Sequence, residues 1–233
     1  MIKKFIIPLV LFCSIFPAVA QDRGEGHLGS WFMFFATHRV ADHWSIHSEI
    51  QYRTYEFGQN LNQLLLRTGV NYHFDKNTSA TLGYGYIPTD QTFEEIPGEK
   101  KLIEHRIFEQ AVLKNKLGNL SLTHRYRLEH RFLKSPSGAS DTQHRMRYLL
   151  RLTYPLSEKW FVSAYDELFV NLQEPIFGQN RLYGAIGYKF TPKLTAQVGY
   201  MKNHFTGINY DRFQLGFWWE IDWRKESVEN KEG

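Results

Sequence analysis

The chain of 233 residues contains a single cysteine, Cys13, which lies in an apolar segment near the N-terminus. We expect that segment to be removed, so a disulfide framework and cysteine nucleophiles are excluded from the mature protein. Long hydrophobic runs are also scarce, because no stretch after residue 20 reaches the ~18 apolar residues of a transmembrane helix. The formal net charge is only +4, and Lys3 and Lys4 contribute two of these charges. Nucleic-acid binding therefore has no support from charge.

The N-terminal segment has the pattern of a secretory signal. Lys3 and Lys4 precede an apolar run at 5–16, and Ala18-Val19-Ala20 forms a small-x-small cleavage site. The run is too short for a membrane anchor, so the pattern predicts a cleaved signal peptide. We expect a signal peptide over 1–20, one barrel domain over 21–223 and a polar C-terminal tail over 224–233.

The segment 123–132 alternates with a period of two residues. Its charged residues occupy every second position, at Arg125, Arg127, Glu129 and Arg131. The positions between them carry His124, Tyr126, Leu128, His130 and Phe132. Side chains of a β-strand point alternately to opposite faces, so one face is charged and the other is mostly apolar and aromatic.

The same alternation recurs along most of the chain and predicts a single antiparallel up-and-down transmembrane β-barrel, an all-β fold. Strands are expected at 30–40, 44–52, 62–74, 80–86, 103–117, 120–132, 144–154, 160–172, 181–190, 194–201 and 211–223. The alternation is blurred at Phe108 and Glu109, where a bulge would explain it. Bacterial single-chain barrels have even strand numbers. We therefore expect twelve strands, the twelfth near 24–29, or else ten.

Short and long connections alternate along the chain. Short turns are expected at 41–43, 75–77, 118–119, 157–159 and 191–193, and longer polar loops at 56–61, 88–102, 133–143, 173–179 and 203–209. Tight periplasmic turns and longer extracellular loops are typical of outer-membrane barrels, whose aromatic residues gather at the two membrane interfaces. The expected location is the outer membrane, and the expected partners are its lipid and the barrel-assembly machinery. Composition predicts no oligomeric state.

The charged face defines the candidate site, because charges facing lipid at mid-depth would cost about 2–4 kcal/mol each. Its arginines are Arg53, Arg67, Arg125, Arg127, Arg131, Arg145, Arg147, Arg151, Arg181 and Arg212, and its acids are Glu49, Glu129, Glu167 and Glu220. One interpretation is a narrow pore that prefers small anionic solutes, with Arg127 and Arg147 at the constriction and Arg125, Arg145 and Arg151 as the approach. The other is a packed polar core that closes the barrel as a structural or interaction scaffold.

Catalytic, metal and cofactor sites have little support. His124 and His130 are expected on the outer face, Ser48 lies on another strand, and no Gly-x-Ser-x-Gly elbow occurs. His47 and Glu49 share the inner face, but two ligands do not make a metal site. We expect no enzyme, metal or cofactor. An outer-membrane lipid-modifying enzyme stays as a lesser alternative, together with a soluble lipid-binding barrel of inverted phase.

Three segments carry a family resemblance. The segments 124–129 (HRYRLE), 165–171 (YDELFVN) and 179–183 (QNRLY), the last leading to Gly187-Tyr188, resemble a family of barrel-like proteins from Gram-negative bacteria, the domain of unknown function 2490. The resemblance covers most of the mature chain. It implies an outer-membrane type of barrel and implies no activity, substrate or catalytic residue. The architecture alone is also similar to small porins for acidic oligosaccharides.

Overall fold

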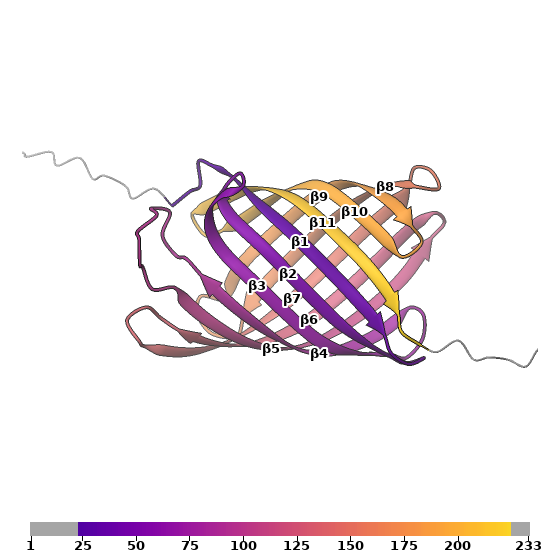
Figure 1. The fold of residues 1–233 in the computed structure, drawn as a ribbon, viewed down its shortest axis with the longest axis horizontal. Coiled ribbons are helices and arrows are strands. Elements are labelled where there is room, and N and C mark those ends of the chain that lie inside the picture. The colour runs from indigo at the N-terminus through magenta and orange to yellow at the C-terminus, as the bar shows by residue number, and fades with distance from the viewer. Residues whose placement is uncertain (1–22, 225–233) are drawn as a thin grey trace, which may run out of the picture.

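The computed structural model describes residues 23–224, which form a closed barrel with its axis horizontal in Figure 1. The expected signal peptide and all but the first residue of the expected tail lie outside the described residues. The strands are β1 (Leu28–Arg39), β2 (Trp44–Glu56), β3 (Gln59–His73), β4 (Thr78–Thr89), β5 (Leu102–Leu117), β6 (Leu120–Lys134), β7 (Ser140–Pro155), β8 (Trp160–Asn171), β9 (Phe177–Thr191), β10 (Leu194–Phe205) and β11 (Ile208–Asp222). Within the described range no helix is long and apolar enough to cross a membrane.

The barrel closes through a parallel pair. Each strand pairs in antiparallel fashion with the next along the chain, and β1 pairs with β11 in parallel from Leu28↔Asp211 to Arg39↔Asp222. The antiparallel all-β barrel is confirmed, but the expected count of twelve strands, or ten, is wrong for residues 23–224, which contain eleven. No separate strand forms at 24–29, because the first strand begins at Leu28 and joins the last strand directly.

The strands are longer than the alternation of the sequence indicates, mainly at the end of the barrel where the expected long loops lie, which we call the loop end; the opposite end is the turn end. The loop segments between strands shrink to 57–58, 90–101, 135–139, 172–176 and 206–207. The expected contrast between short turns and long loops therefore holds clearly only for 90–101. Polar residues at a strand end can continue the ladder, because pairing satisfies their backbone groups whatever their side chains are.

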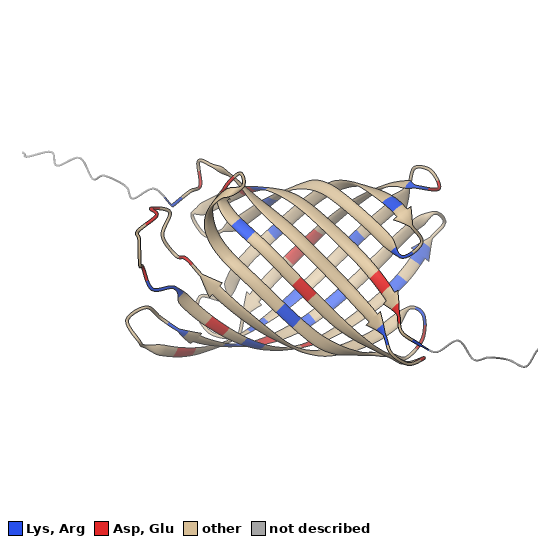
Figure 2. Ribbon diagram, viewed as in Figure 1, with Lys and Arg blue, Asp and Glu red and all other residues tan. Residues whose placement is uncertain are grey.

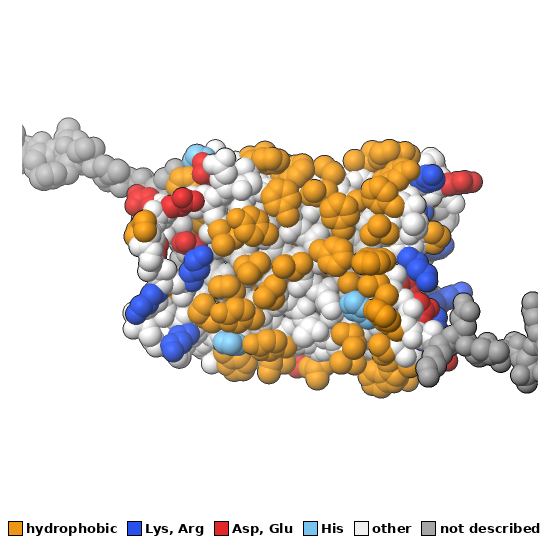
Figure 3. All heavy atoms as spheres, in the orientation of Figure 1, with side chains coloured by type: hydrophobic (Ala, Val, Ile, Leu, Met, Phe, Trp, Pro, Cys, Tyr) orange, Lys and Arg blue, Asp and Glu red, His pale blue; other side chains and the backbone are white. Residues whose placement is uncertain are grey.

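The outer surface is mostly apolar between the two ends of the barrel, and Glu109 on β5 and Asp166 on β8 are charged exceptions. Figure 3 shows hydrophobic side chains across the middle of the visible face, with charged side chains gathered near both ends. Leu82, Ile186 and Val198 are among the exposed apolar residues, whereas Glu129 and Arg127 are buried inside. The alternative of a soluble barrel with an apolar core and a charged exterior is therefore wrong for this structure.

The blurred segment of β5 has a simple explanation. Phe108 points into the lumen and is 1% exposed, whereas Glu109 points outward. The pairings of β5 with β4 and β6 show no register shift. The bulge expected there is absent, and the irregularities of the described strands lie instead near Arg53, Phe169 and Leu194. Phe108 faces inward because it fills the space above Gly83, whose added Cβ would lie 2.2 Å from the phenyl ring.

Candidate functional site in the barrel lumen

Glu129 on β6 is the centre of the charged interior. Its side chain is fully buried, and its carboxylate oxygens lie 2.6 Å from Arg147, 3.2 Å from Arg106 and 3.6 Å from Arg127. Arg145 also donates to it. These arginines come from β5, β6 and β7, which are neighbours in the barrel. The buried carboxylate therefore joins three strands through charge-assisted hydrogen bonds.

Three further glutamates repeat this arrangement at other points of the wall. Glu167 on β8 accepts from Arg125 and Arg147, each at 2.6 Å, and lies 3.8 Å from Arg181. Glu104 binds Arg106 and Arg131, and Glu49 binds Arg67 and His47. All four glutamates are at most 6% exposed. Figure 2 shows charged residues recurring along the middle of the strands as well as at their ends.

Arginine outnumbers acid in this interior. Eight of its arginines lie within 4.0 Å of one of the four glutamates. Across residues 23–224, no ion pair is formed by Arg53, Arg151 or Arg212. Buried guanidinium nitrogens of Arg67, Arg125, Arg127 and Arg151 have no hydrogen-bond partner among the protein's own atoms. The lumen therefore carries a surplus of positive charge.

Two arginine rows lie side by side, as the hairpin of β6 and β7 predicts. Arg127 faces Arg147 directly in the register, and Glu129 faces Arg145. The like charges are tolerated because Arg127 and Arg147 share the carboxylate of Glu129. Their guanidinium groups also lie over aromatic rings, at 4.7 Å from Phe108 and 4.2 Å from Phe169. We call the group formed by Arg106, Arg125, Arg127, Glu129, Arg145, Arg147 and Glu167 the arginine wall.

The opposite side of the lumen is built differently. Trp31, Met33, Tyr183 and Met201 form a buried cluster, against which Phe35 packs. Trp218 stacks on Phe35, with ring centroids 4.9 Å apart. We call these six residues, which come from β1, β9, β10 and β11, the aromatic wall.

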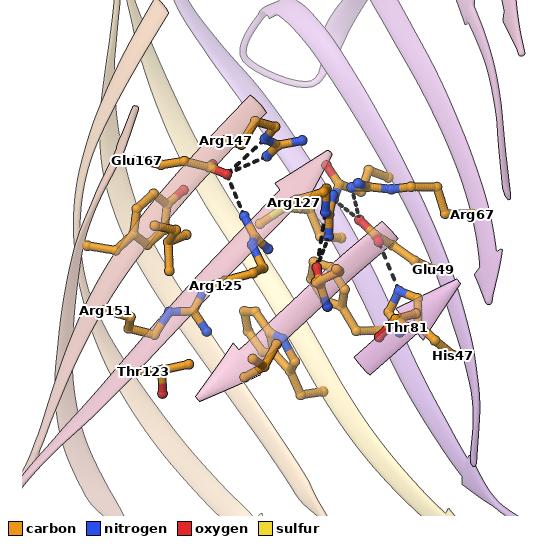
Figure 4. A pocket seen from close by; sticks show the side chains of 18 of the residues that line it. His47, Glu49, Arg67, Thr81, Thr123, Arg125, Arg127, Arg147, Arg151 and Glu167 are labelled. Atoms are coloured by element: carbon orange, nitrogen blue, oxygen red, sulfur yellow. Dashed lines mark hydrogen bonds and ion pairs between the residues drawn. The ribbon is translucent and has the colours of Figure 1, made fainter. Parts of the chain in front are cut away.

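The lumen holds two cavities that meet in its middle. One, of about 280 Å³, lies toward the turn end and is drawn in Figure 4; the other, of about 400 Å³, lies toward the loop end. Five residues line both cavities, namely Trp31, Arg53, Arg67, Arg147 and Arg181. The ring of Trp31 lies 3.7 Å from the guanidinium carbon of Arg53 and 4.9 Å from that of Arg181. These five residues form the layer at which the two cavities meet.

The ten arginines expected inside the barrel all line one or both cavities. Arg147 lies in the layer between the cavities, whereas Arg127 lines the turn-side cavity only. Glu49, Glu129 and Glu167 are buried in ion pairs. Glu220 stands apart at the turn end, where its side chain is 56% exposed and lies 4.0 Å from Arg39.

Sequence reasoning missed Glu104 and Arg106, which are 2% and 5% exposed and belong to the charged interior. Both lie on β5, the strand whose phase is blurred by Phe108 and Glu109. The alternation of 102–106 by itself carries the signal, since Glu104 and Arg106 are separated by His105 and flanked by Ile103 and Ile107.

The catalytic candidates that the sequence suggested, His124, His130 and Ser48, do not come together in the structure. His124 binds the hydroxyl of Tyr148, and His130 lies 2.8 Å from His144 and 3.4 Å from Glu109. Ser48 is on β2, which is separated from β6 by β3, β4 and β5. No serine–histidine pair forms among these residues. No group of three or more His, Cys, Asp or Glu suited to a metal ion occurs in the described part of the chain.

Comparison with known proteins places the chain in a family. Among solved structures, a porin named NanC, in a rhombohedral crystal form, is similar with a TM-score of 0.46 and 10% sequence identity, over 75% of this chain and 86% of that chain. No curated protein matches the chain. A family model described as "Protein of unknown function (DUF2490)" matches residues 28–214. The chain therefore belongs to the family of the domain of unknown function 2490, as its motifs at 124–129, 165–171 and 179–188 predict.

Proposed function

We propose that the protein is an outer-membrane barrel whose lumen is a narrow pore that prefers small anions. The observation that carries this proposal is the surplus of arginine in the interior, where three arginines of the described chain contact no acid. A core that only closes a barrel needs cations in proportion to its acids, because an unpaired buried charge is costly. A surplus of guanidinium groups lining cavities instead attracts anions.

Placement in the outer membrane is supported by the distribution of polarity. A closed barrel satisfies its backbone hydrogen bonds internally, which a hydrocarbon environment requires. Apolar side chains such as Leu82 and Ile186 are exposed on the strands, and such a surface is unfavourable in water. Outer-membrane lipid and the barrel-assembly machinery are the partners that this placement implies.

A closed scaffold is the second candidate, and the glutamate-centred ion pairs favour it. Glu129 and Glu167 each contact at least three arginines. The cavities also meet at a layer that contains the large side chain of Trp31. Such a network could close the lumen without transport.

Planar-bilayer conductance of the purified barrel, with Arg127 and Arg147 both replaced by alanine, separates the two candidates. The double variant still leaves Glu129 with Arg106 and Arg145, and leaves Glu167 with Arg125 and Arg181. A pore is therefore expected to assemble normally and to lose anion preference. Lys189→Ala, which removes an exposed charge near a turn, is the control for simple charge loss. If the wild-type barrel shows no conductance and the double variant unfolds more easily than the wild type, the closed scaffold is the correct function instead.

A further inference from the structure

Arg151 on β7 differs from the other arginines of the turn-side cavity. Its side chain makes no hydrogen bond or ion pair within residues 23–224, and its Nε is buried without a partner. The ring centroid of Tyr165 lies 5.4 Å from the guanidinium carbon of Arg151. In Figure 4 no dashed line reaches Arg151, whereas Arg125 and Arg147 are both connected to Glu167. The guanidinium of Arg151 is therefore available to donate hydrogen bonds to a ligand in the cavity.

Two neighbours complete a set of donors around Arg151. Thr123 on β6 is directly opposite Arg151 in the strand register, and Arg125 is the next inward residue of β6. Arg125 uses Nη2 to bind Glu167 at 2.6 Å, but its Nε has no partner. Glu167 on the neighbouring strand β8 is buried and is already surrounded by Arg125, Arg147 and Arg181. A carboxylate at Arg151 would meet guanidinium and hydroxyl donors.

The wall across the cavity is aromatic. In the closed strand order, β6 lies across the barrel from β1 and β11. Phe35 on β1 and Trp218 on β11 line the same cavity and stack on each other with an interplanar angle of 9°. A pair of stacked rings offers a flat apolar surface to a ligand. The cavity therefore has a cationic side and a flat apolar side.

The size of the cavity limits the ligand. Its volume of about 280 Å³ is just below the roughly 300–1,000 Å³ typical of ligand pockets. A single ring bearing one acid group suits this space better than an oligomer does. Chloride or phosphate would use the arginines but not the aromatic surface.

We propose that the turn-side cavity binds a small organic carboxylate that carries a ring. Arg151, Arg125 and Thr123 hold the carboxylate, and Phe35 and Trp218 contact the ring. This inference rests on the proposed anion preference and specifies its substrate class. The ring can be aromatic or alicyclic, since both present an apolar face to the stacked rings.

Isothermal titration calorimetry on the mature full-length barrel in detergent tests the site without requiring conductance. Benzoate and cyclohexanecarboxylate are the ring probes, acetate lacks the ring, and benzamide lacks the charge. We expect the better ring carboxylate to bind at least about tenfold more tightly than acetate, and benzamide to bind no better than acetate. Equal binding of benzoate and benzamide, or of benzoate and acetate, would overturn the proposal.

Arg151→Gln is the decisive variant, because it leaves no acid without its partner. We expect it to weaken binding of the ring carboxylate by about tenfold or more, with unchanged migration of the unheated barrel on gels. Thr123→Val serves as a second variant and should weaken binding less. Lys189→Gln, which also removes one positive charge, should leave the affinity unchanged. Unchanged affinity in Arg151→Gln would refute the site.

The two proposals fail in different ways. Binding of the ring carboxylate by a barrel that conducts no ions would refute the pore and keep the site. An anion-selective conductance in a barrel that binds acetate and benzoate equally would keep the pore and refute the site.

Discussion

The arginine wall and the aromatic wall enclose the same lumen, but they are held together by different interactions. In the arginine wall, five arginines from β5, β6 and β7 are arranged around Glu129 and Glu167, and each glutamate contacts at least three guanidinium groups. In the aromatic wall, Trp31, Met33, Tyr183 and Met201 pack as an ordinary buried cluster. The stability of the arginine wall depends on ion pairs with two glutamates, whereas the stability of the aromatic wall depends on close packing of apolar side chains.

Glycines provide the shape of the aromatic wall. A Cβ added at Gly216 would lie 2.5 Å from the ring of Trp218, and one added at Gly199 would lie 2.7 Å from the ring of Tyr183. The rings therefore occupy space that any larger residue would take. The arginine wall instead contains side chains whose positions are set by directional hydrogen bonds. A change of charge should damage one wall, and a change of volume should damage the other.

The largest effect is expected for Glu129→Gln in the arginine wall. Four arginines lose their shared carboxylate, so the free energy of unfolding should fall by about 3–5 kcal/mol, as when one partner of a buried ion pair is removed. Urea unfolding of the folded barrel, followed by its gel mobility, measures this change. Glu220→Gln is the matched control, because Glu220 is more than half exposed, and it should change stability by less than about 0.5 kcal/mol. Similar losses in both variants would mean that the network is not the source of stability.

An intermediate effect is expected where the outer face of β6 is compared with its inner face. Leu128→Arg places a charge on the apolar outer surface and should cost about 2–4 kcal/mol near mid-membrane. Thr123→Arg places the same side chain inside the turn-side cavity, where it should be tolerated much better. The yield of heat-modifiable, membrane-inserted barrel measures both. Equal yields would contradict the assignment of the two faces.

A smaller effect is expected for Gly216→Ala in the aromatic wall. The added methyl group has to displace the ring of Trp218 and should cost about 1–3 kcal/mol, as overpacking of a core does. Gly184→Ala is the control, because nothing lies within 4 Å of its added Cβ, and it should be nearly neutral. Urea unfolding again gives the comparison. If Gly216→Ala is also neutral, the aromatic wall is looser than its packing indicates.

The inward or outward direction of most residues could be predicted from the sequence. Arg127, Glu129 and Arg147 are inside, and Tyr126 and Leu128 are outside, as their alternation predicts. β5 is the exception, because Phe108 and Glu109 reverse the usual polarity of the two faces. The ring of Phe108 fills the space left by Gly83 on the neighbouring strand β4. The sequence around Phe108 does not show this space, so the apolar side chain could not be assigned to the charged inner face from its own segment. Glu104 and Arg106 were missed because the reversed polarity of Phe108 and Glu109 obscured the phase of β5, although the alternation at 102–106 places both residues on the inner face.

Whether a charged residue joins the ion-pair network depends on its position along the barrel axis as well as on whether it faces the lumen. Glu220 was placed among the acids of the charged inner face, but it lies at the turn end beside Arg39. Glu104, from a different strand, binds Arg106 and Arg131 in its place. Alternation identifies which face a residue occupies, but the position along the barrel axis depends on how neighbouring strands are staggered.

The sequence by itself determined the strands, their two faces and the concentration of arginine on the inner face, because β-structure has a local period of two residues and lipid excludes unpaired charge. Only the tertiary structure decided the number of strands and the ion pairs across them. Closure of β1 against β11 in parallel joins the first and last strands of the described residues. That contact, like the sharing of Glu129 among three strands, depends on long-range register, which no local period specifies.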